Sequence, residues 1–167
     1  MFLSKFNQTD QSEIRKLLNH CVHIDRWADE IISQRPFSSQ QALLKSAEDS
    51  AKTWSWNEIL DALNTHPRIG EKKAQKELSD QEQNFSNREQ AGISQSKETL
   101  DAIYKGNLAY EKKYGFIFLI KASGLSSEDI LTALNYRLSN DPEIEKRIVH
   151  QQLLEIALLR LSQEITA

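Results

Sequence analysis

Residues 10–32, DQSEIRKLLNHCVHIDRWADEII, contain the pattern that decides the fold class. Their apolar side chains recur at spacings near three and four, which places them on one face of an α-helix. These residues are Ile14, Leu17, Leu18, Cys21, Trp27, Ala28, Ile31 and Ile32. Thr9 or Asp10 can cap the start, and Arg35-Pro36-Phe37 can end the helix because proline restricts the residue before it. The stretch therefore predicts one long amphipathic helix.

The helical period continues along the rest of the chain. Ser38 with Gln41 and Ser55 with Glu58 match the capping-box pattern and predict two more helices, the second of which runs into His66. Further helices are predicted over 71–78, from about Leu100 to a stop at Gly115, after Ser126 or Ser127, and after Asp141-Pro142. The apolar run 116–120 is either a buried extended segment or the start of a helix. We expect one all-α domain, residues 1–167, of about seven or eight helices.

The composition is that of a soluble globular protein. Hydrophobic residues make up 39% and charged residues 27%, and the net charge of −3 comes without a basic stripe, so nucleic acid is not expected as a partner. No apolar run approaches the ~20 residues of a membrane span, and the N-terminus lacks the pattern of a signal peptide. Cys21 is the only cysteine, which suits a reducing compartment. We expect a cytoplasmic protein.

The segment His66-Pro67-Arg68-Ile69-Gly70 is a short, stiff break between helical patterns. Pro67 fixes its own φ and biases His66 away from the helical region, while Gly70 admits conformations that other residues resist. Histidine is the side chain best suited to proton transfer near neutral pH. His66 is therefore either a structural loop residue or a candidate acid–base group.

Two further polar groups also have a structural and a functional interpretation. Ser86 and Glu89 match a helix cap, but a helix N-terminus also attracts anionic ligands. Arg160 is flanked by Leu159 and Leu161, so it is either a solvated helical arginine or a guanidinium that enters a pocket and holds a polar substrate group. Arg137 is the next candidate for the second role.

A metal site is not expected. His20 and His23 are three residues apart and could share a helix face near Asp25, but no cysteine pair or His-Glu-x-x-His pattern supports them. Cys21 lies on the apolar face and is expected to be a core residue rather than a nucleophile. No pair of glycines is spaced to cradle a phosphate group.

Five segments, taken in order, resemble the OHCU decarboxylase family, whose substrate is 2-oxo-4-hydroxy-4-carboxy-5-ureidoimidazoline. They are Arg35-Pro36-Phe37, His66-Pro67-Arg68-Ile69-Gly70, Ser86-x-x-Glu89-Gln90-x-Gly92, Tyr114-Gly115-Phe116-Ile117-Phe118 and Arg160-Leu161. The resemblance spans roughly residues 10 to 162. Each motif alone is weak, whereas five in the right order with similar spacing are specific.

The resemblance implies an all-α, generally homodimeric enzyme of urate degradation that needs no cofactor or metal. It implies decarboxylation to (S)-allantoin with stereoselective protonation, and catalytic roles for His66 and Glu89. It implies substrate contacts at Pro67, Ser86, Asn87, Arg88, Glu89, Gln90 and Arg160, and along the backbone of Phe118, Leu119, Ile120, Lys121 and Ala122. Lys121 stands where a small or apolar residue is expected. Backbone contacts are still expected there, and a further contact from the Lys121 side chain stays open.

Two other functions stay open from the sequence. A different enzyme of the same fold would act on another ureido or hydantoin-like acid. A non-enzymatic helical interaction module would need an exposed apolar groove, and it would not need His66.

Overall fold

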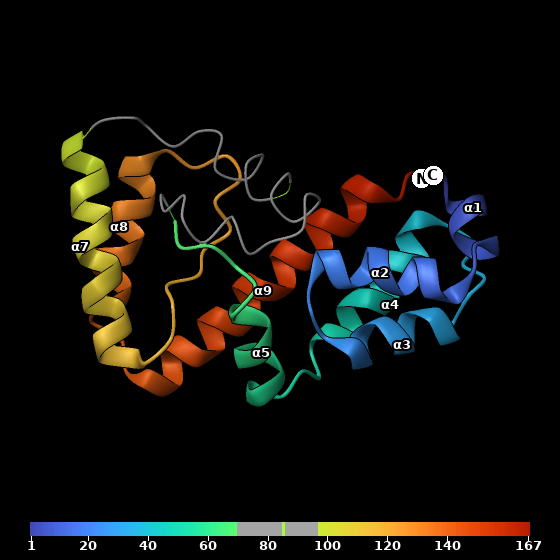
Figure 1. Ribbon diagram of the computed structural model, residues 1–167, viewed down its shortest axis with the longest axis horizontal. Helices are drawn as coiled ribbons and strands as arrows, with labels where there is room; N and C mark the ends of the chain where they lie inside the picture. Colours follow the sequence, from blue (N-terminus) through green and yellow to red (C-terminus); the bar gives the residue numbers. More distant parts are fainter. Residues whose placement is uncertain (70–84, 86–96) are drawn as a thin grey trace. The chain divides into compact units, whose positions relative to one another are not determined.

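The structure is a computed structural model that describes residues 1–69, 85 and 97–167 (Figure 1). Its helices are α1 Leu3–Gln8, α2 Gln11–Cys21, α3 Asp25–Ser33, α4 Gln40–Ala51, α5 Trp56–Leu63, α7 Lys97–Tyr114, α8 Ser127–Arg137 and α9 Pro142–Glu164. Apart from an isolated bridge between Phe2 and Thr166, the described residues contain no β-structure. The prediction of an all-α protein is confirmed, and the eight helices of the described residues agree with the predicted seven or eight.

The described residues form two compact units. The terminal unit contains residues 1–62 and 153–167, and the central unit contains residues 63–152. Helix α9 contributes residues to both. The central unit contains the predicted histidine turn and the apolar run 116–120, whereas Arg160 belongs to the terminal unit.

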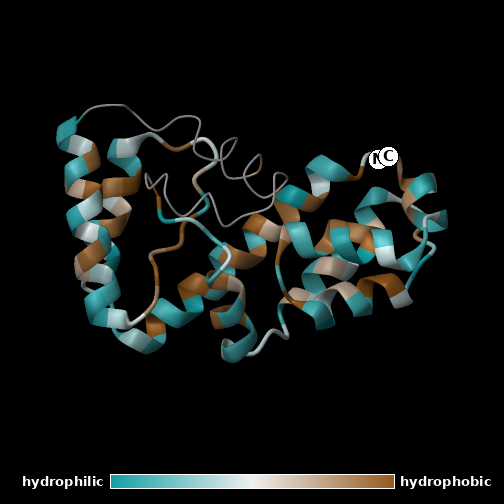
Figure 2. Ribbon diagram, viewed as in Figure 1, coloured by the Kyte–Doolittle hydropathy of each residue, from teal (hydrophilic) through white to brown (hydrophobic). Residues whose placement is uncertain are grey.

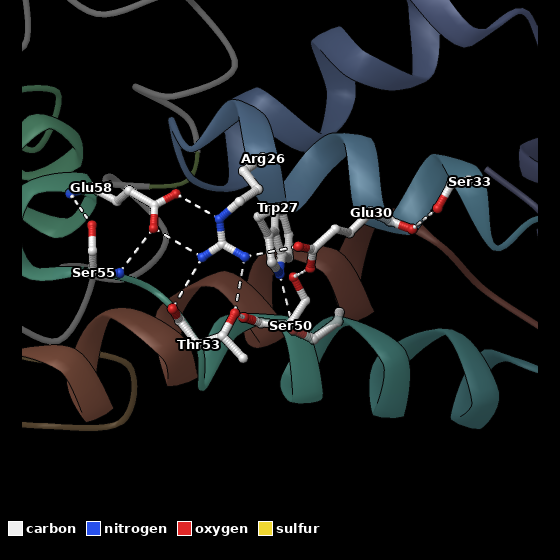
Figure 3. Close-up of polar contacts among 9 residues, drawn as sticks. Arg26, Trp27, Glu30, Ser33, Ser50, Thr53, Ser55 and Glu58 are labelled. Atoms are coloured by element: carbon white, nitrogen blue, oxygen red, sulfur yellow. Dashed lines mark hydrogen bonds and ion pairs between the residues drawn. The ribbon is translucent and has the colours of Figure 1, made fainter.

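The terminal unit is built on α3, which packs against α2 and α4. Trp27 is fully buried, donates a hydrogen bond from Nε1 to the Ala47 carbonyl at 2.9 Å, and meets Trp54 edge to face at 6.2 Å. Beside it, the Arg26 guanidinium binds Glu58 through two nitrogens at 3.0 and 2.9 Å and Glu30 at 2.8 Å (Figure 3). This network ties α3 to the start of α5.

The N-terminal and C-terminal segments pair with each other inside the terminal unit. Leu3 N donates to the Thr166 carbonyl at 2.8 Å, and Thr166 N donates to the Met1 carbonyl at 2.9 Å. The two ends of the chain therefore lie side by side (Figure 1).

The prediction of one long helix across residues 10–32 was wrong. Asp10 caps α2 by accepting from Ser12 N at 2.9 Å, but α2 ends at Cys21 and α3 begins at Asp25. Val22 and Ile24 between them adopt extended backbone and are almost fully buried. Both are β-branched residues, which accept extended backbone readily, and the break lets their side chains reach the core. Helix α1 was also not anticipated.

Most of the predicted helix boundaries are confirmed. Ser55 and Glu58 form both bonds of a capping box at the start of α5, and Ser126 forms one with Asp129 at α8. Gly115 follows α7 with a φ of +84°, the left-handed conformation that glycine accepts at a helix end. The cap of α4 is Ser39 instead of the predicted Ser38. The helix predicted over 71–78 lies outside the described residues.

The core of the central unit lies between α7 and α8. Gly106 lets the two helices approach closely, because a Cβ at this position would lie 2.5 Å from Leu134 Cδ2. The cluster around this contact, called here the central cluster, contains the buried residues Ile69, Ile103, Tyr110, Phe118, Ala122, Ile130 and Leu134. It includes residues from both the histidine turn and the segment after α7.

Candidate active site

The turn that carries His66 begins where α5 ends. The helix stops at Leu63, and His66 N donates a hydrogen bond to the Leu63 carbonyl at 3.1 Å. The prediction that this helix runs straight into His66 was therefore wrong by three residues. His66 is half-buried and Pro67 is buried, so the imidazole is held at the edge of the packed region rather than on an exposed loop.

Polar contacts with α7 anchor the residues after His66. The Asn107 amide donates to the Ile69 carbonyl at 3.3 Å, in a buried position. Arg68 Nε donates to Glu111 Oε1 at 2.7 Å, one helical turn further along α7. Ile69 itself joins the central cluster. The two contacts and the buried Ile69 side chain hold the turn in place. The backbone of His66 at the start of this turn is therefore held as well.

The apolar run 116–120 is not helical, and neither is the rest of the predicted site segment 118–122. Of the two interpretations left open for the run 116–120, the helical one is therefore wrong. Figure 2 shows the chain after α7 as a hydrophobic stretch. Phe118, Leu119 and Ala122 are buried, whereas Ile120 and Lys121 are half-buried. Phe118 and Ala122 pack on the central cluster together with Ile69. The fold thus brings two of the predicted site segments onto one core.

A buried ion pair between Arg137 and Glu145 contacts segment 118–122. Arg137 and Glu145 are 5% and 0% exposed, and the guanidinium donates from Nε to Glu145 Oε1 at 2.6 Å. Arg137 Nη1 donates to the Leu119 carbonyl at 2.6 Å, and its guanidinium lies over the Phe118 ring at 4.5 Å. Arg137 lies in the last turn of α8, and Glu145 lies in the first turn of α9.

The same carboxylate also binds two other groups. The Tyr110 hydroxyl donates to Glu145 Oε1 at 2.5 Å, and the Asn140 amide donates to Oε2 at 3.1 Å. Burial, together with the neighbouring carboxylate, raises the pKa of Tyr110 far above its usual range. The phenol therefore stays neutral and acts as a hydrogen-bond donor to Glu145.

Sequence reasoning missed Glu145 and Gln152, and it considered Arg137 only as a substitute for Arg160. Gln152 Oε1 accepts a hydrogen bond from Lys121 N at 2.8 Å. No local pattern separates Glu145 or Gln152 from the many other polar residues of α9, because their role depends on a contact with a distant segment. Arg137 had only its place on a helix as a signal.

Arg160 is buried in the terminal unit. It is 4% exposed, and its Nη1 donates to the Cys21 carbonyl at 3.2 Å, at the end of α2. The interpretation of Arg160 as a solvated arginine is therefore wrong. Cys21 is fully buried, as expected for a core residue.

Several predicted site residues lie outside the part of the chain that the structure describes. These are Ser86, Asn87, Arg88, Glu89 and Gln90. Within residues 1–69, 85 and 97–167, no three His, Cys, Asp or Glu side chains are grouped to hold a metal ion. His20 and His23 do not share a helix, because α2 ends between them. No helix among the described residues has the length and hydrophobicity to cross a membrane.

Comparison with known proteins gives first the fold. The structure matches a crystal structure of OHCU decarboxylase solved in the presence of (S)-allantoin, with a TM-score of 0.72 and 24% identity over 93% of this chain and 98% of the other. A crystal structure of (S)-allantoin synthase matches with a TM-score of 0.71 and 19% identity, over 99% of this chain and 54% of the other. The fold is that of these proteins.

The sequence comparison then gives the family. The model of the OHCU decarboxylase family matches residues 7–162, so the chain belongs to this family. The uric acid degradation bifunctional protein TTL of Arabidopsis thaliana is 28% identical over 86% of this chain and 44% of its own length. The 2-oxo-4-hydroxy-4-carboxy-5-ureidoimidazoline decarboxylase of Haloferax volcanii is 24% identical over 99% and 96%. The chain thus spans less than half of the bifunctional relative and nearly all of the second.

Proposed function

We propose that this chain decarboxylates 2-oxo-4-hydroxy-4-carboxy-5-ureidoimidazoline (OHCU) to (S)-allantoin in the degradation of urate. The observation that carries the proposal is the family match over residues 7–162, which includes the complete His66–Gly70 motif. The anchored turn that holds His66 and the largely buried segment 118–122 support it, because both belong to the predicted site and pack on one core.

The substrate explains why no separate electron acceptor is needed in this proposal. The carboxylate that leaves is attached to a carbon beside a C=N bond. When the C–C bond breaks and CO2 departs, its electron pair moves into a new C=C bond, and the imine nitrogen takes a proton. A proton is then added to the neighbouring carbon of the resulting enol-like species, while its hydroxyl group releases a proton to solvent and becomes a carbonyl. Electron sinks such as pyridoxal phosphate perform the first task in other decarboxylases.

His66 and Glu89 are the proposed catalytic residues. His66 delivers the proton to one face of the enol-like species, which makes the product a single enantiomer. The carboxylate of Glu89 orients the imidazole or accepts hydrogen bonds from the ureido group. A rigid turn suits this role, because orientation of a proton donor relative to one face of the substrate contributes strongly to the rate.

The remaining site residues are proposed to bind the substrate. Pro67 and the segments 86–90 and 118–122 contact the ring and the ureido group, the latter segment through its backbone. Arg160 holds a polar or anionic part of the substrate, since its planar guanidinium can bind such a group with two hydrogen bonds. The burial of its side chain supports a role other than solvation.

We also propose one functional domain over residues 1–167, a homodimer and a cytoplasmic location, in keeping with the family resemblance. Tyr104 and Leu108 lie one helical turn apart on α7 and are 61% and 49% exposed. They form an apolar surface of the kind that a second copy would cover. Light scattering across a concentration series measures the oligomeric state directly.

The decisive experiment adds purified protein to freshly formed intermediates of urate oxidation and follows the optical activity of the allantoin formed. The proposal expects faster decarboxylation and enrichment of the (S)-enantiomer. Spontaneous decay to racemic allantoin at an unchanged rate would favour a helical interaction module instead. Faster consumption of another ureido or hydantoin-like acid, with no effect on OHCU, would favour a different enzyme of the same fold.

A further inference from the structure

The backbone of Ile120 is fixed from both sides by side chains of α8 and α9. Arg137 Nη1 donates to the carbonyl of the preceding residue, Leu119, at 2.6 Å. Gln152 Oε1 accepts from the N–H of the following residue, Lys121, at 2.8 Å. All of these groups lie in the central unit. The two contacts hold the two peptide groups that flank Ile120.

These contacts determine where the polar groups of Ile120 point. The peptide bonds on both sides of Ile120 are trans and planar, so the C=O and N–H of each peptide point in opposite directions. Because the Leu119 carbonyl is directed at Arg137, the Ile120 N–H is directed away from Arg137. Because the Lys121 N–H is directed at Gln152, the Ile120 carbonyl is directed away from Gln152. The N–H and the C=O of Ile120 are thus oriented through the neighbouring peptide groups, although Arg137 and Gln152 do not bind them directly.

The Arg137 contact is itself held rigidly. Glu145 is fully buried, accepts from Arg137 Nε at 2.6 Å, and lies 2.5 Å from Arg137 Nη2. The Tyr110 hydroxyl binds the same carboxylate oxygen at 2.5 Å, and Phe118 lies under the guanidinium at 4.5 Å. A guanidinium fixed by so many partners loses little freedom when it also binds a carbonyl.

We infer that Arg137 and Gln152 are positioning residues for the recognition of a ureide. They turn the N–H and C=O of Ile120 toward the substrate, where this pair matches the adjacent C=O and N–H of a ureido group or hydantoin-type ring. This inference rests on the proposed function, since it assumes that segment 118–122 contacts the substrate. Neither residue touches the substrate, and each acts through the backbone of the segment.

The expected consequence is a change in substrate binding rather than in the chemical step. Hydrogen bonds from Ile120 to the ureide are present both in the bound substrate and in the transition state. Their loss therefore raises KM and leaves kcat little changed. A neutral hydrogen bond has a net strength that corresponds to roughly a two- to tenfold change in affinity.

Gln152→Met is the variant that tests this inference. Methionine has a similar length but offers no strong acceptor for the Lys121 N–H. The neighbouring Gln151 is exposed on the same helix, so Gln151→Met is the matched control. Gln152→Glu keeps an acceptor oxygen at the same position and serves as the conservative rescue. Arg137→Lys keeps the charge beside Glu145 but lacks the planar fork, and it provides an independent second variant.

Steady-state kinetics with freshly formed OHCU and thermal unfolding are measured on all five proteins. We expect KM to rise roughly two- to tenfold in Gln152→Met and in Arg137→Lys. We expect wild-type KM in Gln152→Glu and Gln151→Met, and an unchanged Tm in the three variants at positions 151 and 152. Wild-type KM in a folded Gln152→Met protein, or an equal rise in Gln151→Met, would overturn the inference alone. A wild-type protein that does not accelerate the reaction would overturn the proposed function and the inference with it.

Discussion

The Glu145 carboxylate gives the strongest prediction about stability. Glu145→Gln keeps the size of the side chain and removes its charge, which leaves the Arg137 guanidinium buried without a counter-ion. In the wild-type protein the carboxylate binds Arg137 Nε at 2.6 Å, the Tyr110 hydroxyl at 2.5 Å and the Asn140 amide at 3.1 Å. All of these groups are donors. The amide NH2 of a glutamine would be a fourth donor among them. At least one of the three groups would then face this NH2 instead of an acceptor, and that contact would be repulsive.

The magnitude follows from the burial of the pair. Arg137 is 5% exposed and Glu145 is 0% exposed, so water cannot solvate the Arg137 guanidinium in place of the lost carboxylate charge. Removal of one partner from a buried ion pair costs about 3–5 kcal/mol. For a chain of this length each kcal/mol lowers the Tm by about 2–4 °C, so we expect a fall of roughly 6–20 °C.

Urea unfolding followed by circular dichroism measures the free energy of unfolding. The double variant Arg137→Met/Glu145→Gln removes the buried positive charge as well, and we expect it to be more stable than Glu145→Gln alone. Glu143→Gln is the control, since Glu143 pairs with Lys146 at 3.3 Å on the surface of the same helix and is 78% exposed. Its effect should stay below about 1 kcal/mol. A Glu145→Gln protein within 1 kcal/mol of wild type, or a double variant less stable than the single one, would refute this reasoning.

Four other predictions concern the proposed site and the Arg26 network. His66→Asn should lower the decarboxylation rate by about 10²–10⁴-fold while circular dichroism stays that of the folded protein, and a folded variant with wild-type turnover would remove His66 from catalysis. Glu89→Gln keeps a side chain accepted in a capping box, so activity should fall with a stability change below about 1 kcal/mol, and equal activity would reduce Glu89 to a neutral or capping residue. Arg160→Lys should lower kcat/KM for OHCU by a factor that corresponds to a loss of roughly 1.5–3 kcal/mol in binding free energy. Unchanged kinetics in both Arg160→Lys and Arg160→Ala would make Arg160 a packing residue. Arg26 holds the pKa of Glu58 below its ordinary value of 4.5. Glu58 therefore contributes stability above pH 4.5, and this contribution is lost as the pH falls through the lower folded-state pKa. Urea unfolding at pH 7 and pH 3 should show a smaller loss of unfolding free energy in Glu58→Gln than in wild type.

The sequence by itself determined the class of fold and most helix boundaries. Capping side chains act within one helical turn, which is why Ser55 with Glu58 and a serine before α8 could be located from spacing alone. Gly115 marked the end of α7 for the same local reason. The family resemblance depended on the order and spacing of five short motifs along the chain, which can be recognised without any tertiary contact, and the family is confirmed.

Tertiary structure decided the features that depend on burial. The break between α2 and α3 brings Val22 and Ile24 into the core, although the helical period of the neighbouring apolar residues continues across it. Segment 118–122 overlaps the apolar run 116–120, whose conformation was undetermined because a short apolar run suits either a helix or an extended chain. Its carbonyl at Leu119 and its N–H at Lys121 bind Arg137 and Gln152, which are 18 and 31 residues away. Such partners leave no periodic signal in the sequence, because their position is set by the packing of whole helices rather than by spacing along one of them.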